Sequence, residues 1–386
     1  MEPFDFQLPT HIHFGVGRYE EVGQDCAAIG RKVLLHYGGG SIKKSGLYDR
    51  IVAALEKAGC EVVPLGGVQP NPRLELVQEG IALAKREQVD MILAVGGGSV
   101  IDSAKGIAAG AKMDGDVWDC YLGKAPVTEA LPVGVVLTIP AAGSECSDVT
   151  VVTRPDTHDK RSFHAAAVTP RFAIIAPDVF LTLPKAQIAN ATVDVISHIC
   201  ERFFSDSTHV TLTDRLCIAS IETAMQLGLY LYEHPDDVDA WAEFALTANV
   251  AHNGFLGQGR IEDWGAHGIG HELSAFYDMP HGASLAIAIP AWMRYVSAKK
   301  PVRFVQFARE VMHIYVQDEA EAIALAIQDF EAFCHRLGLA TTLTQAGLAD
   351  ADLAAMAASV VKYRARGNFY VLHEEDCLRI YELARG

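Results

Sequence analysis

The chain has 386 residues, half of them hydrophobic, and a formal net charge of −16. This length exceeds the usual size of one domain, so we expect two. The negative charge argues against nucleic acid and an anionic membrane as partners, because both require a contiguous cationic surface. The apolar run 283–293 is too short to span a bilayer and contains Pro290. It predicts a buried helix, and we expect no membrane segment.

The N-terminus and the cysteines indicate a cytoplasmic protein. The first residues, "MEPFDFQLPTHIHFG", include acidic side chains and no apolar stretch of the kind found in secretory signals. The eight cysteines are scattered, with no CxxC pair. We therefore expect reduced thiols rather than a disulfide frame or a structural zinc site.

Residues 1–182 predict an α/β dinucleotide-binding domain with a Rossmann-like parallel sheet. Short β-branched runs alternate with amphipathic segments, which is the pattern of βαβ units. The expected strands are "HIHFGVG" (11–17, an edge strand), "KVLLHY" (32–37), "EVVPLG" (61–66), "MILAVGGGS" (91–99), "VGVVLTIP" (133–140) and "FAIIAP" (172–177). The expected helices are residues 46–59 and 73–88, and residues 149–154 and 160–166 form a predicted hairpin across "PDTHD".

Residues 183–386 predict an all-α domain. Strand signals stop near residue 182, where "LTLP" supplies a proline at a helix N-terminus. Helical periodicity then predicts helices at 186–205, 236–252 and 319–338.

Two copies of Gly-Gly-Gly-Ser follow strand-like runs, at residues 37–46 and 94–106. Glycine lets a backbone approach an anion closely, and a helix N-terminus beyond it presents free N–H groups. The second copy has this strand, glycine, helix order, which favours a pyrophosphate site beside Gly97, Gly98 and Ser99. Neither copy has the GxGxxG spacing. For either copy alone, the alternative is a tight turn without a ligand.

Two further features follow the glycine turns. Asp102 lies one helical turn beyond Ser99, where it is suited either to accept hydrogen bonds from a ribose or to cap the helix. The segment "LTIPAAGSE" (137–145) follows a strand with small residues, which suits backbone contact with a flat ring or a ribose. Small-residue packing is the alternative interpretation of that segment.

An acid and three histidines have the spacing of a metal site. Asp194 and His198 are four positions apart and share a helix face, and His267 and His271 repeat this spacing. One aspartate and three histidines would give the mixed oxygen and nitrogen coordination that suits Fe²⁺ or Zn²⁺. Any single histidine in an apolar helix is more often a hydrogen-bonded core residue.

The clustering of the histidines favours a binding site over ordinary core packing. The stretch 264–282 holds His267, His271 and His281 together with four glycines, a density that weakens a helix and calls for a reason such as a closely approaching cofactor. The pair His267 and His271 is not the HExxH of zinc proteases, because Gly268 occupies the place of the catalytic glutamate.

Three motifs together resemble the iron-containing, or group III, alcohol dehydrogenase family: "VGGGSVIDSAKG", "DVISH" and "HGIGHELSAFYDMPHG". The resemblance covers nearly the whole chain. Within the family, the chain is most similar to NADPH-dependent aldehyde reductases and butanol dehydrogenases. They share "YGGGS" followed by two lysines, "PNP", and a segment similar to "IEDWGAH" at the start of the histidine motif.

The resemblance implies the roles of individual residues. The implied metal ligands are Asp194, His198, His267 and His281. His271 is then left unbound near the reacting alcohol or aldehyde, where an imidazole is suited to relay a proton. Ala142 departs from relatives that often carry a hydroxyl there. The implied cofactor contacts are Gly38, Gly39, Gly40, Ser41, Asn71, Gly97, Gly98, Ser99, Asp102, Thr138 and Lys160.

The predicted function is a metal-dependent oxidoreductase that transfers a hydride between NADP(H) and a small aldehyde or primary alcohol, working as an aldehyde reductase with one Fe²⁺ or Zn²⁺ ion. NADP(H) is expected because no acid follows "KVLLHY" until Asp49, whereas Lys43 and Lys44 suit a 2′-phosphate. The expected edge strand also predicts a homodimer. The alternatives are a metal-dependent hydrolase or lyase, and a non-catalytic nucleotide-binding relative.

Overall fold

The computed structural model describes residues 1–386 and divides the chain into two compact units. The first, here called the α/β unit, comprises Gln7–Leu183 and Pro235–Asn249. The second, here called the helical unit, comprises Met1–Phe6, Pro184–His234 and Val250–Gly386.

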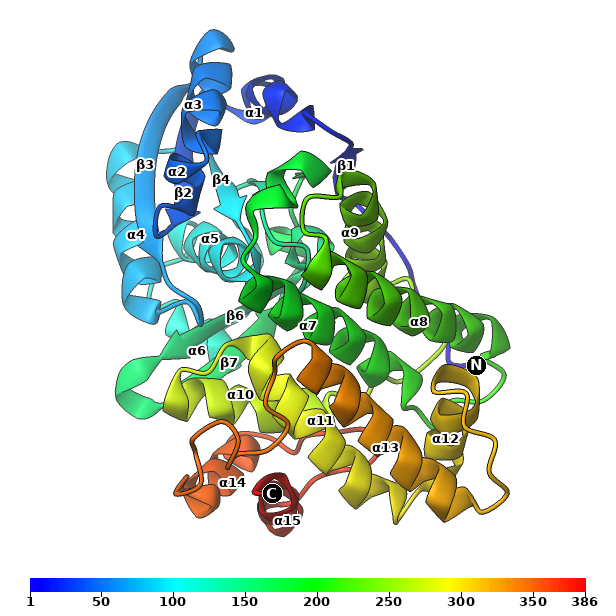
Figure 1. The fold of residues 1–386 in the computed structure, drawn as a ribbon. Coiled ribbons are helices and arrows are strands. Elements are labelled where there is room, and N and C mark those ends of the chain that lie inside the picture. Colours follow the sequence, from blue (N-terminus) through cyan, green and yellow to red (C-terminus); the bar gives the residue numbers. More distant parts are fainter. The chain divides into compact units, whose positions relative to one another are not determined.

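The α/β unit is built on a six-stranded sheet with the order β1-β8-β5-β4-β2-β3. Figure 1 labels four of its strands, β1, β2, β3 and β4. All neighbouring strands in it are parallel, which confirms the predicted Rossmann-like sheet. β1 lies at one end of the order, as expected for an edge strand. The strands are β1 (His11–Phe14), β2 (Lys32–Gly38), β3 (Glu61–Val68), β4 (Met91–Gly96), β5 (Val133–Leu137) and β8 (Phe172–Ile175).

Helices cover both faces of this sheet. Alternate side chains of a strand point to opposite faces, so each strand can pack against helices on both sides. Val33 and Leu35 of β2 belong to the core that includes residues of α1 and α3. His36, the residue after Leu35, faces the other way, and its Nε2 lies 2.8 Å from Ser103 Oγ of α5. The helices are α1 (Val22–Ile29), α2 (Ser41–Lys44), α3 (Leu47–Lys57), α4 (Leu74–Glu87), α5 (Gly98–Ala111) and α6 (Trp118–Tyr121).

A separate hairpin follows β5. β6 (Val149–Arg154) and β7 (Asp159–His164) pair antiparallel, with Val149 opposite His164 and Arg154 opposite Asp159. The turn between them includes His158 in the left-handed conformation, with φ of 53°. This confirms the hairpin predicted across "PDTHD".

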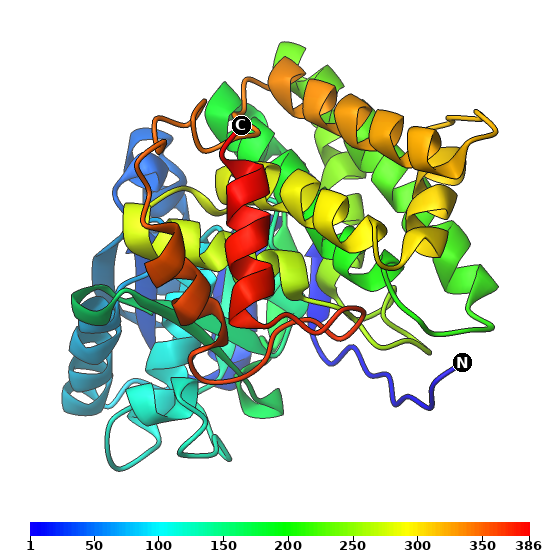
Figure 2. The ribbon, with the colours of Figure 1, turned by 90° about the horizontal axis from the view of Figure 1, so that it is seen from below.

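The helical unit contains no named strand, which confirms the predicted all-α part. Its long apolar helix α11 is buried over most of its length and includes Pro290, as predicted. Figure 2 shows α15 (red) beside α11 (yellow), with which it packs. The helices are α7 (Lys185–Phe203), α8 (Thr211–Glu233), α10 (Gly265–Tyr277), α11 (His281–Ser297), α12 (Pro301–Gln306), α13 (Glu319–Arg336), α14 (Leu353–Val361) and α15 (Glu374–Ala384).

Two segments differ from the expectation of contiguous domains at 1–182 and 183–386. Residues 235–249, which form most of α9 (Val238–His252), belong to the α/β unit. There the ring of Trp241 lies 5.7 Å from that of Phe180. Residues 1–6 belong to the helical unit, where the backbone N–H of Glu2 donates to Gly259 O at 2.9 Å. Helical periodicity shows which face of a helix is apolar, but it does not show which unit that face joins.

None of the helices has the length and apolar character needed to cross a membrane. All eight cysteines are buried as free thiols.

Candidate metal centre and cofactor-binding turns

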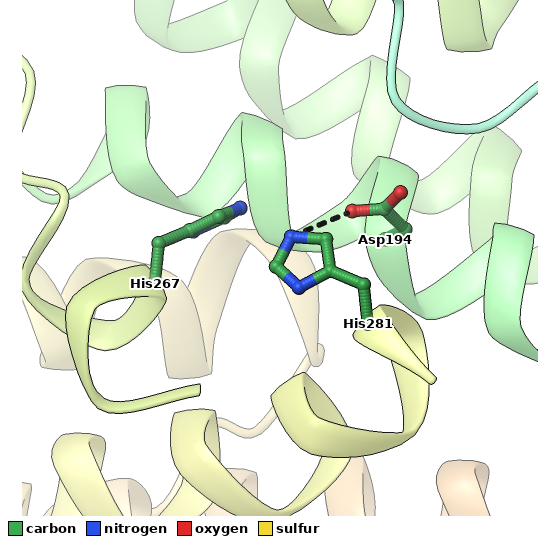
Figure 3. Close-up of side chains that lie close together, drawn as sticks. All are labelled: Asp194, His267 and His281. Carbon is green, nitrogen blue, oxygen red and sulfur yellow. Dashed lines mark ion pairs between the residues drawn. The ribbon is translucent and has the colours of Figure 1, made fainter. Parts of the chain in front are cut away.

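Asp194, His267 and His281 point toward one another in the helical unit (Figure 3). They come from α7, from α10 and from the first residue of α11. One ligand atom from each lies within 4.8 Å of the others. The structure therefore brings together an acid and two histidines from three helices, each of which carries a metal-binding atom.

A glycine allows α11 to begin against α7. A Cβ added at Gly282 would lie 2.1 Å from the carbonyl oxygen of Asn190, so no other residue fits there without moving a helix. This close approach places His281, the preceding residue, beside α7. His281 Nε2 lies 3.7 Å from Asp194 Oδ1.

The carboxylate of Asp194 is suited to a divalent cation. Asp194 is only 5% exposed, and its Oδ1 makes no hydrogen bond, although His198 Nδ1 lies 3.2 Å from it. A buried carboxylate oxygen without a hydrogen bond is costly unless a positive charge compensates it. One carboxylate with imidazole nitrogens is also a donor set that Fe²⁺ and Zn²⁺ accept. The residues present therefore fit the predicted metal ion.

His198 adjoins this cluster. Its ring centroid lies 4.7 Å from that of His267, and its Nδ1 lies 2.8 Å from the carbonyl oxygen of Asp194. A carbonyl oxygen can only accept, so Nδ1 carries the proton and Nε2 keeps its lone pair. His198 is not among the three residues whose ligand atoms converge. Its place as a fourth ligand stays a prediction.

Glu201 holds His267 in place, a role that was not predicted from the sequence. The Glu201 carboxylate accepts hydrogen bonds from the backbone N–H and from Nδ1 of His267, at 2.8 and 2.7 Å. It also accepts from the backbone N–H of Trp264 at 2.6 Å. These contacts orient the imidazole so that Nε2 remains as the ligand atom. Asp194, His198 and Glu201 follow each other at i, i+4 and i+7, a helix-face spacing that was the available signal.

A second buried carboxylate also organises the start of α10. Asp263 accepts hydrogen bonds from the backbone N–H groups of Gly265, Asn368 and Phe369, at 3.1, 2.7 and 2.7 Å. Burial raises the pKa of both Asp263 and Glu201 to about 7, and the backbone hydrogen bonds oppose that rise. Both acids accept hydrogen bonds from backbone N–H groups at the start of α10, which have no partner within the helix, so both stabilise the ligand-bearing helix.

His271 lies one turn along α10 from His267. Its ring centroid is 5.2 Å from that of His281 and 6.3 Å from that of His267. It is half-buried and does not belong to the three converging ligands. This placement leaves it beside the cluster.

The predicted cofactor residues lie in the α/β unit, mostly at one edge of its sheet. β5, β4 and β2 are parallel neighbours, so their carboxyl ends meet at the same edge. Gly38 ends β2 and residues 39–41 follow it, Gly97–Ser99 follow β4, and Thr138 follows β5. The backbone N–H of Thr138 donates to Gly96 O at 3.0 Å, which joins two of these segments.

The other predicted cofactor residues, Asn71, Lys160 and Asp102, form hydrogen bonds with protein groups. Asn71 follows β3, and its Oδ1 accepts a hydrogen bond from Lys160 Nζ at 2.9 Å. Asp102 does not cap α5, which begins after Gly97 without a side-chain cap. Its carboxylate instead accepts hydrogen bonds from Ser144 Oγ and from the backbone N–H of Val151, at 2.6 and 3.1 Å.

The turn after β2 is open. A Cβ added at Gly39 would meet no atom within 4 Å, whereas Gly40 has a φ of 120° that side chains rarely adopt. Lys43 and Lys44 just beyond are exposed, and Lys43 Nζ lies 4.8 Å from the ring centroid of Tyr48. The turn therefore has room for an anion beside two cations.

Comparison with known families decides the classification. Residues 9–177 match the model "Iron-containing alcohol dehydrogenase", and residues 188–385 match "Fe-containing alcohol dehydrogenase family, C-terminal". The chain belongs to the iron-containing alcohol dehydrogenase family. This confirms the resemblance carried by the glycine turn and the histidine motifs.

Individual relatives in the iron-containing alcohol dehydrogenase family match over almost their whole length. The chain is 38% identical to a probable NADH-dependent butanol dehydrogenase 1 of Bacillus subtilis, over 98% of this chain and 99% of the relative. It is 34% identical to the NADPH-dependent aldehyde reductase YqhD of Escherichia coli, over 100% of both. The crystal structure of NADH-dependent butanol dehydrogenase A from Thermotoga maritima matches with a TM-score of 0.97 and 41% identity, over 100% of this chain and 99% of that one.

Glu201→Gln tests the carboxylate that orients His267. The amide keeps the size but loses the charge, so we expect iron affinity to fall roughly 10- to 100-fold, as for other partners of metal-binding histidines. Metal titration under anaerobic conditions measures the effect. Unchanged iron affinity in a folded Glu201→Gln protein would show that Glu201 does not support the metal site.

Gly282→Ala tests the close approach of α11 to α7. The added Cβ would lie 2.1 Å from a backbone oxygen, so α11 must move and carry His281 away from Asp194. We expect lower bound iron and a lower melting temperature. The matched control is Gly39→Ala, whose Cβ meets nothing within 4 Å and which should keep full iron content. Equal iron in the two variants would contradict this role for Gly282.

Proposed function

We propose that the chain transfers a hydride between NADP(H) and a small alcohol and aldehyde pair, and that it works as a metal-dependent aldehyde reductase. One observation supports this most strongly. The converging Asp194, His267 and His281 occur in a chain that also carries two glycine-rich turns at the carboxyl edge of a parallel sheet. A metal ligand set and a dinucleotide site together are what this reaction requires.

The metal ion would be held by Asp194, His267 and His281, with His198 as the fourth ligand. When bound, a divalent ion supplies Lewis-acid polarisation of a carbonyl oxygen and stabilises negative charge on that oxygen. Asp194 provides the single anionic ligand, and Glu201 keeps the His267 imidazole in the orientation that binds. Iron is the metal in the family name, so we propose Fe²⁺ and keep Zn²⁺ as the alternative.

His271 is the proposed proton relay. A hydride adds to the carbonyl carbon of the aldehyde, and the oxygen that becomes negative must then take a proton to give the alcohol. An imidazole ordinarily titrates near neutral pH, which suits it to this task. The ring of His271 lies beside His281 and outside the ligand set, which supports the assignment.

NADP(H) is the proposed cofactor. An acidic side chain after the second strand would accept from a ribose hydroxyl and repel a 2′-phosphate, but here that turn contains Gly38–Ser41. The open space at Gly39 and the exposed Lys43 and Lys44 support a phosphate site. The relatives differ on this point, because the butanol dehydrogenases are named for NADH and the aldehyde reductase for NADPH.

Two alternatives are not favoured. A metal-dependent hydrolase or lyase would use the same ligands to activate water but has no need of the glycine turns. A non-catalytic nucleotide-binding relative would have no need of the converging acid and histidines. Loss of the absorbance band of reduced nicotinamide when butanal is added to the iron-loaded protein with NADPH or NADH tests the function. Absence of this change with both cofactors would contradict it.

The homodimer remains part of the proposal. β1 is bonded to β8 on one side and lies at the end of the strand order, so its outer edge is a place where a second copy can add a strand. Light scattering that gives a monomer mass would contradict this.

Asp194→Asn and His271→Ala, compared with each other, separate binding of the metal from catalysis. The amide keeps the shape but removes the only anionic ligand, so we expect iron content and aldehyde reduction to fall together. The matched variant is His271→Ala, for which we expect normal iron content and a loss of kcat of roughly a hundredfold or more. Metal analysis and steady-state rates measure both effects.

Two outcomes would contradict these assignments. Full iron content and normal turnover in Asp194→Asn would remove it from the ligand set. Iron loss in His271→Ala equal to that in His267→Ala would make His271 a ligand rather than a relay.

Gly39→Asp tests the choice of cofactor. The position has room for a side chain, and a carboxylate there would repel a 2′-phosphate and accept from a 2′-hydroxyl. We expect kcat/KM to favour NADPH in the unmodified protein and NADH in the variant, mainly through KM. The control is Gly39→Asn, which has similar size and no charge. Equal or better kcat/KM with NADH in the unmodified protein would contradict the proposed NADPH preference.

A further inference from the structure

A buried ammonium group ties helix α5 to the segment that follows β5. Lys105 of α5 is fully buried. Its Nζ donates to the carbonyl oxygens of Ser144, Ser147 and Val149, at 2.6, 2.8 and 2.9 Å. The hydroxyl oxygens of Ser144 and Ser147 lie at 3.0 and 3.3 Å. These five oxygens share three N–H groups and surround the charge as they would surround a small cation.

The same turn of α5 reaches this segment through Asp102. Ser144 Oγ donates to Asp102 Oδ1 at 2.6 Å, and the backbone N–H of Val151 donates to Asp102 Oδ2 at 3.1 Å. Thr150 Oγ1 donates to the carbonyl oxygen of Asp102 at 2.7 Å. Lys105 therefore acts on Asp102 through a relay, since it donates to the hydroxyl that in turn donates to the carboxylate.

Charge supports this arrangement. Burial lowers the pKa of Lys105 to about 8, and the negative charges of Asp102, Glu145 and Asp148 oppose the fall. The side chain is thus mainly charged at neutral pH. Burial raises the pKa of Asp102, and the charge of Lys105 opposes that rise in turn. Each buried charge therefore favours the charged form of the other.

The segment after β5 also packs closely against the glycine turn. A Cβ added at Gly97 would lie 3.1 Å from Ile139 Cβ, and one added at Gly98 would lie 3.1 Å from Ala142 Cβ. Little space separates the start of α5 from residues 139–142. The position of residues 139–142 therefore determines how much space is left for a ligand beside the glycine turn.

We propose that Lys105 is a positioning residue for the nicotinamide cofactor, a tethered cation that holds residues 144–149 and Asp102 in the geometry that binds the nucleotide. The proposal rests on the proposed function and on the predicted cofactor contacts at Gly97–Ser99, Asp102 and Thr138. Lys105 works through the oxygens that surround it, because all five belong to the protein. Residues 144–149 therefore depend on a charge supplied by α5.

Lys105→Met in the full-length, iron-loaded protein is the first test. We expect the Kd for NADPH or NADH, whichever binds more tightly to the unmodified protein, to rise roughly 10- to 100-fold, the effect of losing one charge-assisted hydrogen bond. KM for the cofactor should rise with kcat less affected, since the lost interaction is made in both ground and transition states. Iron content should stay normal. Fluorescence titration and steady-state rates measure these quantities well below the melting temperature.

Chemical rescue distinguishes a tethered cation from a merely structural side chain. Lys105→Ala leaves a cavity lined by the same oxygens, and we expect methylammonium chloride to restore cofactor affinity. Tetramethylammonium chloride at equal ionic strength donates no hydrogen bond and should have no effect. Ser144→Ala removes the relay to Asp102 without leaving a buried charge unpaired. It should weaken cofactor binding in the same direction, and it keeps the proposal testable if the Lys105 variants do not fold.

Several results would overturn the proposal. These are an unchanged Kd in a folded Lys105→Met protein, even with a lower melting temperature, an unchanged Kd in Ser144→Ala, or equal rescue by the two ammonium salts. Failure of the unmodified protein to bind either NADPH or NADH would instead contradict the proposed function.

Discussion

The helical unit is arranged around the buried carboxylate of Asp194, whose charge has to be compensated. Its Oδ1 is buried without a hydrogen bond, and imidazoles from two other helices converge on it. A carboxylate in this position favours a neighbouring cation, and the surrounding nitrogen donors favour a metal cation. The close contact at Gly282 and the carboxylate of Glu201 both serve this convergence, because one places His281 and the other orients His267.

The α/β unit buries a charge of the opposite sign, on Lys105. There a buried positive charge is compensated by backbone carbonyls, hydroxyls and nearby acids, all supplied by the protein. The contrast gives the two buried charges different roles. The carboxylate of Asp194 has an oxygen that can bind a metal cation from solution. The ammonium group of Lys105 is itself the cation that the oxygens of residues 144–149 surround. Both charges lie next to residues that we propose to bind reactants.

Much of the fold could be predicted from the sequence, because its signals are local. The alternation of apolar strands and amphipathic helices predicted the parallel sheet, and "PDTHD" predicted the hairpin between β6 and β7. The placement of residues 235–249 and 1–6 could not be predicted, since it depends on packing between segments far apart in the chain. Periodicity carries no information about such packing.

The candidate site divides in the same way. Histidine clustering and helix-face spacing pointed to Asp194, His198, His267, His271 and His281, and the family resemblance implied which of them are ligands. The structure brings Asp194, His267 and His281 together. Glu201 and Lys105 were missed because their importance lies in partners that only the fold supplies. Glu201 is separated from His267 by 66 positions, and Lys105 from Ser144 by 39. In a sequence, a glutamate or lysine on a helix is most simply interpreted as a solvent-exposed charge.

The central claim is that the acid and the histidines of the helical unit hold one metal ion. Anomalous diffraction at the iron absorption edge, from crystals of protein purified without air and loaded with Fe²⁺, tests this most directly. We predict a single anomalous peak bonded to the carboxylate of Asp194 and to the imidazoles of His198, His267 and His281, with His271 close by and not bonded. A peak bonded to His271 in place of one of these histidines, or no peak among them in protein that reduces aldehydes, would contradict the assignment.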